Sequence, residues 1–334
     1  DLFNLFVMFE LVLMSSYALV AYSGSKESLF ISLKYVVLNL IGSSLMLVAI
    51  GGLYSVTGTL NMADMAQIFA TGSVNMVPVL GLSTLLFCVF AIKSGLTPFH
   101  FWAPPVYSNS PPPASALMAG ISKKVGIYAV LRLYLTVFSQ AKIPETALMF
   151  AGETVTFVIG HLVGIMAILT VILGGISAIN RKKLDKLLSY SSIGQIGFIF
   201  IPISIVMLEG SINALIAAMT YLVAHALAKP ALFMLSGVIE KITGESKLKN
   251  LGGLSESSFM LSASFFILIF SLVGIPPLLG FFGKLLVFSA AVEAGNMLFI
   301  MVLFIGAVTT LLYASRAWIE IFFGEPVETD MSIL

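Results

Sequence analysis

Residues 90–106 read FAIKSGLTPFHFWAPPV, an apolar stretch of membrane-helix composition that carries a lysine and is then interrupted by glycine and proline. Residues 270–288, FSLVGIPPLLGFFGKLLVF, repeat this arrangement with the lysine after the interruption. Proline removes a backbone donor and crowds the preceding turn, and glycine loosens a helix, so each stretch predicts a broken helix. Freed backbone groups at membrane depth are tolerated inside protein or beside water, so both breaks should face the interior. The break residues are Gly95, Pro98, Gly274, Pro276 and Pro277.

The composition places these two stretches in an integral membrane protein. Hydrophobic residues make up 59% of the 334 residues and charged residues 10%, against about 45–50% and about 25% in an ordinary soluble domain. The net charge is +1 and the charges fall mostly between apolar runs, which argues against a nucleic-acid surface or an acidic substrate. The single cysteine, Cys88, can form no intrachain disulfide.

The apolar runs predict nine membrane-crossing segments. A helix needs about 20 apolar residues to cross the hydrocarbon core of a bilayer. The first run begins at residue 2 without a basic segment or a small-residue cleavage site, so it resembles a truncated helix and not a signal peptide. Nine crossings would put the two chain ends on opposite sides. The segments are 2–22, 29–57, 77–106, 113–138, 154–179, 187–208, 211–238, 258–290 and 296–322.

The connections between these segments predict the orientation. Basic residues gather on one side, in the loop RKKLDK over residues 181–186, near Lys26, and in the connection that contains Lys247. The other side offers little beyond Lys142 and Arg132. The positive-inside rule therefore puts loop 181–186 in the cytoplasm of a multi-pass protein of the cell membrane. Topology alone explains these charges, so we assign no ligand site to them.

The two breaks also predict an internal repeat. If one helix precedes residue 1, the chain divides into two five-helix units, each broken in its fourth helix. An odd helix count per unit inverts one unit relative to the other, which is a common architecture of transporters. We therefore expect an all-α polytopic membrane protein with inverted five-helix repeats and two broken transmembrane helices. The alternative is a pair of unrelated proline kinks, which are common in membrane helices.

A few ionisable residues lie inside the apolar segments. Each costs about 3 kcal/mol or more at the bilayer centre unless it is paired, hydrated or neutral, so each needs a reason. Lys93 and Lys284 flank the two breaks, and Lys124 lies near the middle of residues 113–138. His225 and Lys229 lie four residues apart on one helix face. Glu10 is the one carboxylate deep in the first segments.

These residue types together suggest proton transfer. Four segments that contain lysines outnumber one carboxylate, so structural ion pairs do not account for all of them. A carboxylate beside a buried lysine favours its charged form, which lets Glu10 control when that lysine holds its proton. Histidine titrates near neutrality and can relay a proton. We expect one lateral row near mid-membrane, ordered Glu10, Lys93, Lys124, His225 and Lys284, with Lys229 beside it.

Lys123 takes a secondary place in this prediction. It points about 100° away from Lys124 on the same helix. A substitution of Lys123 should therefore have the milder effect.

Several stretches resemble the proton-translocating antiporter-like subunits. This family includes large membrane subunits of respiratory complex I, subunits of Mrp-type Na+/H+ antiporters, and subunits of energy-converting membrane hydrogenases. The stretches DLFNLFV and GTLNMADMA look closest to the D-type subunit of Mrp antiporters and its hydrogenase counterpart. The resemblance covers nearly the whole chain. It is carried by DLFNLFVMFELVLMSSYALVAY (1–22), KSGLTPFHFWAPPVYSNSPPPASALMAGISKKVGIYAVLR (93–132), HALAKPALFMLSGVI (225–239) and GIPPLLGFFGKLLVF (274–288).

The resemblance assigns a family position to each residue of the row. The family's helix-five glutamate falls on Glu10, and its helix-twelve lysine falls on Lys284. Residues 1–138 would then hold helices 5–8 of the family as an incomplete first half, and residues 139–334 helices 9–13. The chain would begin inside the fifth helix, as a fragment or an incompletely built chain would. The lysines of helices seven and eight, and the histidine and lysine of helix eleven, fall on Lys93, Lys124, His225 and Lys229.

The resemblance implies a proton-translocating subunit of a multisubunit cation/proton antiporter, of the Mrp type and similar to its D-type subunit. The alternative is the equivalent subunit of a membrane-bound hydrogenase or a complex I-like oxidoreductase. The expected partners are other membrane subunits, protons and lipid, and transport of sodium is an open question. We expect no catalytic chemistry, cofactor or metal site in this chain. A stand-alone solute transporter and a redox or hydrolytic membrane enzyme are rivals that no motif supports.

Overall fold

The computed structural model describes residues 1–145, 150–327 and 329, which are folded mainly into helices. Among these residues, eight helical stretches are long and apolar enough to cross a membrane, and the chain is a helical multi-pass membrane protein. The eight stretches are α1 (Leu2–Ala21), α2 (Lys26–Thr57), Met76–Asn109, Pro112–Val137, α8 (Val155–Ile179), α9 (Leu184–Glu209), α10 (Ile212–Thr243) and α14 (Met297–Phe322).

The remaining predicted crossing, 258–290, is two helices and not one. They are α12 (Phe259–Val273) and α13 (Leu279–Glu293), each 15 residues long, separated by the predicted break. The stretch Met76–Asn109 is likewise divided into α4 (Met76–Ser94), the 3-10 turn η1 (Phe99–Trp102) and α5 (Ala103–Asn109). A short helix that the apolar pattern did not predict, α3 (Met62–Thr71), lies between α2 and α4.

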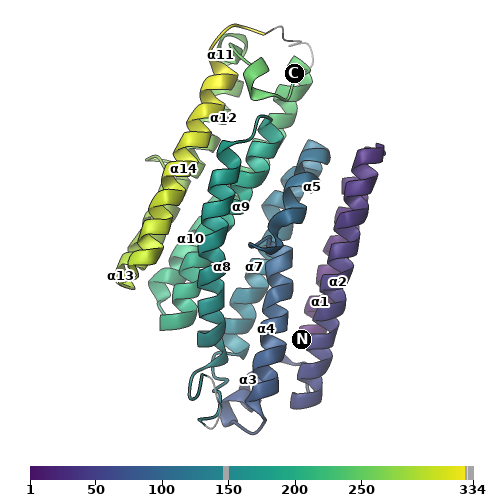
Figure 1. Ribbon diagram of the computed structural model, residues 1–334, viewed down its shortest axis with the longest axis vertical. Coiled ribbons are helices and arrows are strands. Elements are labelled where there is room, and N and C mark those ends of the chain that lie inside the picture. Colours follow the sequence, from purple (N-terminus) through teal and green to yellow (C-terminus); the bar gives the residue numbers. More distant parts are fainter. Residues whose placement is uncertain (146–149, 328, 330–334) are drawn as a thin grey trace.

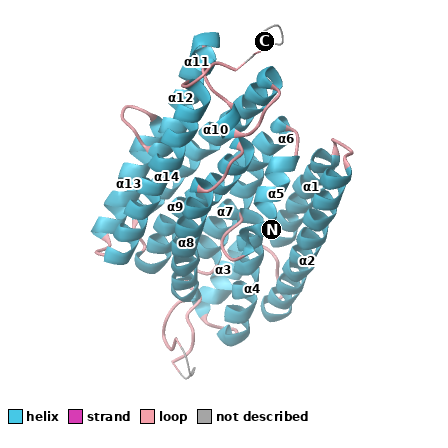
Figure 2. Cartoon of the chain, turned by 45° about the horizontal axis from the view of Figure 1, so that its top comes forward, coloured by secondary structure: helices cyan, strands magenta, loops and turns pink. Residues whose placement is uncertain are grey.

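The helices stand side by side and run alternately up and down (Figure 1). The N-terminus lies toward the lower end of this bundle and the C-terminus at the upper end. Figure 2 shows the same bundle with its upper end turned forward. Two connections meet at that end, where Lys183 and Lys247 form an isolated bridge and the Leu184 N–H donates to the Ser246 carbonyl at 3.1 Å. The last two short elements, η4 (Leu248–Asn250) and α11 (Leu254–Ser257), follow there.

Helix α9 forms the centre of the fold because small residues let its neighbour α8 approach closely. Its apolar stretch is 94% buried, against 22% for α1. A Cβ on Gly174 of α8 would lie 2.3 Å from the backbone nitrogen of Gly194 on α9. A Cβ on Gly197 would lie 2.7 Å from the backbone nitrogen of Val171. Only glycine permits such contact, which is a common way to pack membrane helices tightly.

Both breaks begin with a glycine that caps the preceding helix in the left-handed conformation. Helix α4 ends at Ser94, Gly95 takes a left-handed φ of 73°, and the Leu96 N–H donates to the Ala91 carbonyl at 3.0 Å. Helix α12 ends in the same way at Gly274, with a φ of 91°, and the Ile275 N–H donates to the Phe270 carbonyl at 3.2 Å. This glycine cap satisfies carbonyls at a helix end, and the prolines that follow cannot extend the helix.

The fourth crossing changes its helical pitch twice. It consists of α6 (Pro112–Leu117), a π-helical turn η2 (Met118–Ser122), α7 (Lys123–Arg132) and a second π-helical turn η3 (Leu133–Val137). Turns of this kind are rare and are frequent at functional sites. The first of them ends directly before Lys123.

Candidate functional site

The buried charged residues in the described part of the chain are all basic. Lys123, His225 and Lys229 are each 0% exposed. Lys93, Lys124 and Lys284 are at most 8% exposed. Five of the six were predicted from the sequence, and Lys123 was the one given a secondary place. The set is Lys93, Lys123, Lys124, His225, Lys229 and Lys284.

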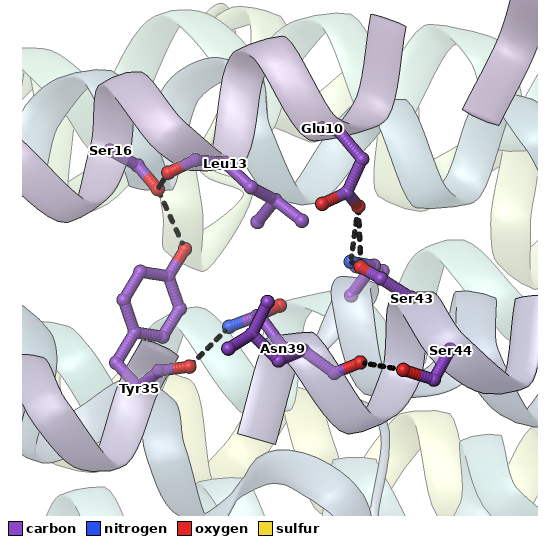
Figure 3. Close-up of polar contacts among 9 residues, drawn as sticks. Glu10, Leu13, Ser16, Tyr35, Asn39, Ser43 and Ser44 are labelled. Atoms are coloured by element: carbon purple, nitrogen blue, oxygen red, sulfur yellow. Dashed lines mark hydrogen bonds and ion pairs between the residues drawn. The ribbon is translucent and has the colours of Figure 1, made fainter. Parts of the chain in front are cut away.

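Glu10 and Lys93 lie together where α1, α2 and α4 meet. The Lys93 Nζ is 3.9 Å from the Glu10 Oε1 and donates to the Ser43 Oγ at 3.2 Å. Ser43 in turn donates to the Glu10 carboxylate, and Figure 3 shows these two side chains pointing at each other across α1 and α2. The prediction that Glu10 lies within reach of Lys93 is confirmed.

Helix α2 supplies a polar stripe that the sequence reasoning missed. Tyr35, Asn39 and Ser43 are four residues apart, so they share one face of the helix, which is buried. The Tyr35 hydroxyl lies 3.1 Å from the Ser16 Oγ, and the Asn39 Nδ2 donates to the Tyr35 carbonyl at 2.8 Å (Figure 3). The regular spacing of these polar residues in an apolar segment was the signal available in the sequence.

A small cavity of about 20 Å³ lies beside Lys93. Its lining includes Asn39, Trp102 and Ser122, the residue directly before Lys123. A cavity of this size, with several polar neighbours, has room for about one water molecule. The cavity therefore extends the surroundings of Lys93 toward helix α7.

Lys124 is the second residue of α7, so it follows the first π-helical turn by one residue. Its Nζ donates to the carbonyl of Ala119, five residues earlier on the same crossing. A π-helical turn is the kind of local irregularity that leaves a backbone carbonyl available to a side chain. The amine is thus held inside the bundle without a carboxylate.

His225 and Lys229 occupy one buried face of α10. The Lys229 Nζ donates to the Leu188 carbonyl at 3.0 Å and to the Ser191 Oγ, both on α9. Neither ring nitrogen of His225 has a hydrogen-bond partner among the described residues. The charges of Lys124, Lys229 and Lys123 all act on His225. His225 therefore faces the interior and not the lipid, as the predicted row requires.

One turn before His225, a buried polar network crosses three helices. Tyr221 of α10 donates to the amide oxygen of Gln195 on α9. The Gln195 Nε2 donates to the Thr310 Oγ1 at 3.0 Å and to the Tyr313 hydroxyl at 2.9 Å, both on α14. The sequence reasoning missed this network because each member is a neutral residue in an otherwise ordinary membrane helix.

Lys284 lies in the second turn of α13, the helix that follows the second break. Its Nζ donates to the carbonyl of Val273, the last residue of α12, at 3.2 Å and lies 4.6 Å from the centre of the Phe198 ring. Both groups favour a positive charge, because a helix C-terminus carries partial negative charge and an aromatic face attracts cations. Phe198 also packs against Tyr221, with ring centroids 5.9 Å apart. Lys284 therefore adjoins the Tyr221 network.

Arg316 and Glu320 form an i, i+4 ion pair on α14. The Arg316 Nε donates to the Glu320 Oε1 at 3.0 Å, and the Arg316 Nη1 donates to the Ile179 carbonyl at 2.8 Å. This pair is partly exposed and lies apart from the buried amines.

Comparison with known proteins finds relatives over nearly the whole chain. The sequence pattern described as "NADH:quinone oxidoreductase/Mrp antiporter, TM" matches residues 1–310. The D-type subunit of the Na(+)/H(+) antiporter of Alkalihalophilus pseudofirmus is 37% identical over 334 residues, which is 99% of this chain and 63% of the relative. The N-type subunit of the NADH-quinone oxidoreductase of Desulforudis audaxviator is 32% identical over 317 residues, 95% of this chain and 60% of that protein. The chain thus spans less than two thirds of these relatives.

Solved structures show the same fold. A chain of the Mrp complex from Dietzia sp. DQ12-45-1b superposes with a TM-score of 0.86 at 29% identity, covering 99% of this chain and 58% of that chain. A chain of the membrane-bound sulfane sulfur reductase, an archaeal respiratory membrane complex, gives 0.85 at 30% identity, covering 98% and 64%.

Proposed function

Because the chain belongs to the NADH:quinone oxidoreductase/Mrp antiporter family of membrane subunits, we propose that it translocates protons as the D-type subunit of an Mrp-type cation/proton antiporter. The protons pass along a relay of Glu10, Lys93, Lys124, His225, Lys229 and Lys284. No catalytic chemistry is assigned to this chain.

One observation supports this proposal above the others. The buried charged residues of the described chain are all basic, and Glu10, the carboxylate paired with Lys93, is itself partly exposed. Five ammonium groups held together in a low-dielectric interior would repel one another and lose their hydration. The row is therefore stable when some members are neutral, and an amine beside an ammonium is a donor and acceptor pair for protons.

The contacts suggest how the proton moves. Glu10 and Ser43 hold the proton on Lys93 at one end, and the Val273 carbonyl holds it on Lys284 at the other. Between them, His225 can accept at one ring nitrogen and donate at the other. Water must bridge the gaps that are too long for direct hydrogen bonds.

The arrangement as two inverted five-helix units, residues 1–138 and 139–334, belongs to the same proposal. Its support is the glycine cap that ends α4 and α12 in the same manner, one in each unit. Each unit would provide one half-channel to a different membrane surface. The RKKLDK loop would face the cytoplasm of the cell membrane.

A complex I-like or hydrogenase-like parent complex is the second candidate. The TM-score of 0.85 to the sulfane sulfur reductase chain is close to that for the Mrp chain, so the fold does not separate them. The 37% identity to the D-type subunit of an antiporter favours the Mrp assembly. Co-purifying the partner subunits decides between the two, and sodium flux measured in the same vesicles tests sodium as a second cargo.

The relay is tested with Lys124→Ala in the intact complex in inverted membrane vesicles. Loss of the amine should abolish proton transport, because one missing carrier interrupts the row, while the partner subunits still co-purify. Lys34→Ala is the matched control, since Lys34 is an exposed membrane-segment lysine whose Nζ lies 4.2 Å from the Phe30 ring. Full transport in Lys124→Ala would overturn the proposed relay.

A further inference from the structure

Lys123 is the most enclosed lysine without an assigned role. Its Nζ lies 4.8 Å from the centre of the Tyr107 ring and 6.0 Å from the centre of the Trp102 ring. Among the described residues no hydrogen-bond partner reaches this Nζ, and the side chain is 0% exposed. The other titratable groups on which its charge acts are Lys124, His100, His225 and Lys229.

Two more unpaired polar atoms lie in the same region. The Ser94 Oγ and the Tyr107 hydroxyl are both buried and have no hydrogen-bond partner among the described residues. A Cβ on Gly126, one turn after Lys123, would lie 2.5 Å from the Ser94 Oγ. A Cβ on Gly95 would lie 3.4 Å from the Lys123 Nζ. The break in α4 therefore lies directly against Lys123.

These unpaired groups point to bound water. A buried polar atom without a partner costs about 1–3 kcal/mol, and more when it is charged. Buried waters in proteins typically satisfy such groups. The cavity beside Lys93 provides space nearby, because Trp102 and Ser122 line it and Ser122 directly precedes Lys123. Lys123 thus shares Trp102 with the cavity beside Lys93, and it directly precedes Lys124 on α7.

We propose that Lys123 is a further proton carrier, which passes protons between Lys93 and Lys124 through water held at the α4 break. This proposal rests on the proposed function of the row. An ammonium on Lys93 gives a proton to a bridging water, and that water gives one of its own protons to the neutral Lys123 amine. One N–H bond breaks and another forms, no electrons are exchanged, and the same step repeats toward Lys124.

If Lys123 had only a structural role, the size or the charge of its side chain would matter, and its ability to transfer a proton would not. Methionine fills nearly the same space as lysine and would pack well between two aromatic rings. Arginine keeps a positive charge over the rings but does not release its proton. Histidine is shorter, yet it can both accept and donate a proton near neutral pH.

The test compares Lys123→Met, Lys123→Arg and Lys123→His in the intact complex in inverted vesicles, with Lys34→Met as the matched control. Proton transport should fall on the order of tenfold or more in the Met and Arg variants, because each removes a proton-transfer group. The His variant should recover part of that loss and should have a changed pH profile. Assembly is measured by co-purification of the partner subunits.

The outcomes separate this proposal from the relay itself. Normal transport in Lys123→Arg, or in Lys123→Met, overturns the role of Lys123 as a carrier. If Lys124→Ala abolishes transport and the Lys123 variants do not, the relay stands without Lys123. If Lys124→Ala also transports normally, the proposed function fails first. Should the Met variant not assemble, the comparison of Arg with His decides.

Discussion

At the scale of single residues, the buried lysines differ in the groups that pair with or accept hydrogen bonds from their Nζ atoms. Lys93 has a carboxylate at 3.9 Å and a hydroxyl at 3.2 Å, whereas Lys124, Lys229 and Lys284 rely on backbone carbonyls or a serine. A carboxylate favours the ammonium more strongly than a carbonyl does. Lys93 is therefore the member of the row whose proton is held most firmly.

Glu10→Gln should lower proton transport while leaving assembly intact. Glutamine keeps the shape of the side chain but removes the charge that acts on Lys93. The free energy of protonating Lys93 therefore changes. We expect the rate of proton transport to decrease on the order of tenfold, because Lys93 loses its charged partner. Glu27→Gln, at an exposed glutamate in the first turn of α2, is the control and should transport normally. Equal rates in both variants would remove Glu10 from the relay.

Glu245 makes the stability of the connection that follows α10 depend on pH. Its carboxylate accepts the N–H of Lys247 at 2.9 Å, the Asn250 amide at 2.6 Å and the N–H of Ser246 at 2.8 Å, and these bonds lower its pKa to about 2. A carboxyl group with a lowered pKa stabilises the folded state fully above its ordinary value of 4.5, and this is lost as the pH falls through about 2.

The comparison of wild type with Glu245→Gln measures this contribution. The variant should melt at a lower temperature in detergent at pH 7, and the difference should shrink as the pH falls below 4.5, the ordinary value of the group. Glu209→Gln, at the exposed end of α9, is the control. A difference in Tm that stayed constant down to pH 3 would contradict the assigned hydrogen bonds.

At the scale of elements, the breaks place charged groups against freed backbone. Gly274 ends α12 so that the Val273 carbonyl meets Lys284, and Gly95 ends α4 so that the turn lies against Lys123. Both glycines have φ values that other residues adopt only with strain. The two breaks are therefore specified by the backbone as much as by the prolines that follow.

Gly274→Ala should destabilise the protein by about 1–3 kcal/mol, the usual cost of a side chain at a left-handed φ. Its Cβ would also lie 3.0 Å from the Lys284 Cδ. Gly51→Ala is the control, because Gly51 lies inside α2 with open space around it and alanine favours a helix. Gly274→Asn should lose less than Gly274→Ala, since asparagine tolerates this conformation. Thermal unfolding in detergent measures all three, and equal stability of the two alanine variants would contradict the cap.

Sequence patterns predict the elements that contrast with an apolar background. A lysine, a proline or a break inside a membrane segment is conspicuous, so Lys93, Lys124, Lys284 and the division of the two helices were predictable. The Gln195 network was not, because neutral polar residues are common in membrane helices and become significant only when three helices bring them together. Lys123 was given a secondary place because an ideal helix turns it away from Lys124. The bundle buries both Lys123 and Lys124 of α7, which the sequence alone does not state.

At the scale of the whole molecule, the alternating helices bring the basic connections to one end. The loop at Lys182 and the connection at Lys247 lie together there, and α3 lies at the opposite end (Figure 1). The positive-inside rule then predicts that this end faces the cytoplasm.

This orientation is tested by cysteine labelling in a Cys88→Ser background, which removes the single native thiol. Lys182→Cys should react with an impermeant maleimide from the cytoplasmic side, in inverted vesicles. Ser73→Cys, in the connection between α3 and α4, should react in right-side-out vesicles. Both residues are exposed, so access is not limited by packing. The reverse labelling pattern would invert the assigned orientation.

The central claim is that buried amines and one imidazole form a continuous hydrated row across the molecule. The most direct measurement is a cryo-EM map of the intact complex at a resolution that shows ordered water. Lys93, Lys123, Lys124, His225 and Lys284 should lie at similar depth, with water bridging successive members and reaching the ring nitrogens of His225. The account is contradicted if His225 is surrounded by dry apolar side chains, or if Lys93 and Lys284 lie at opposite membrane surfaces.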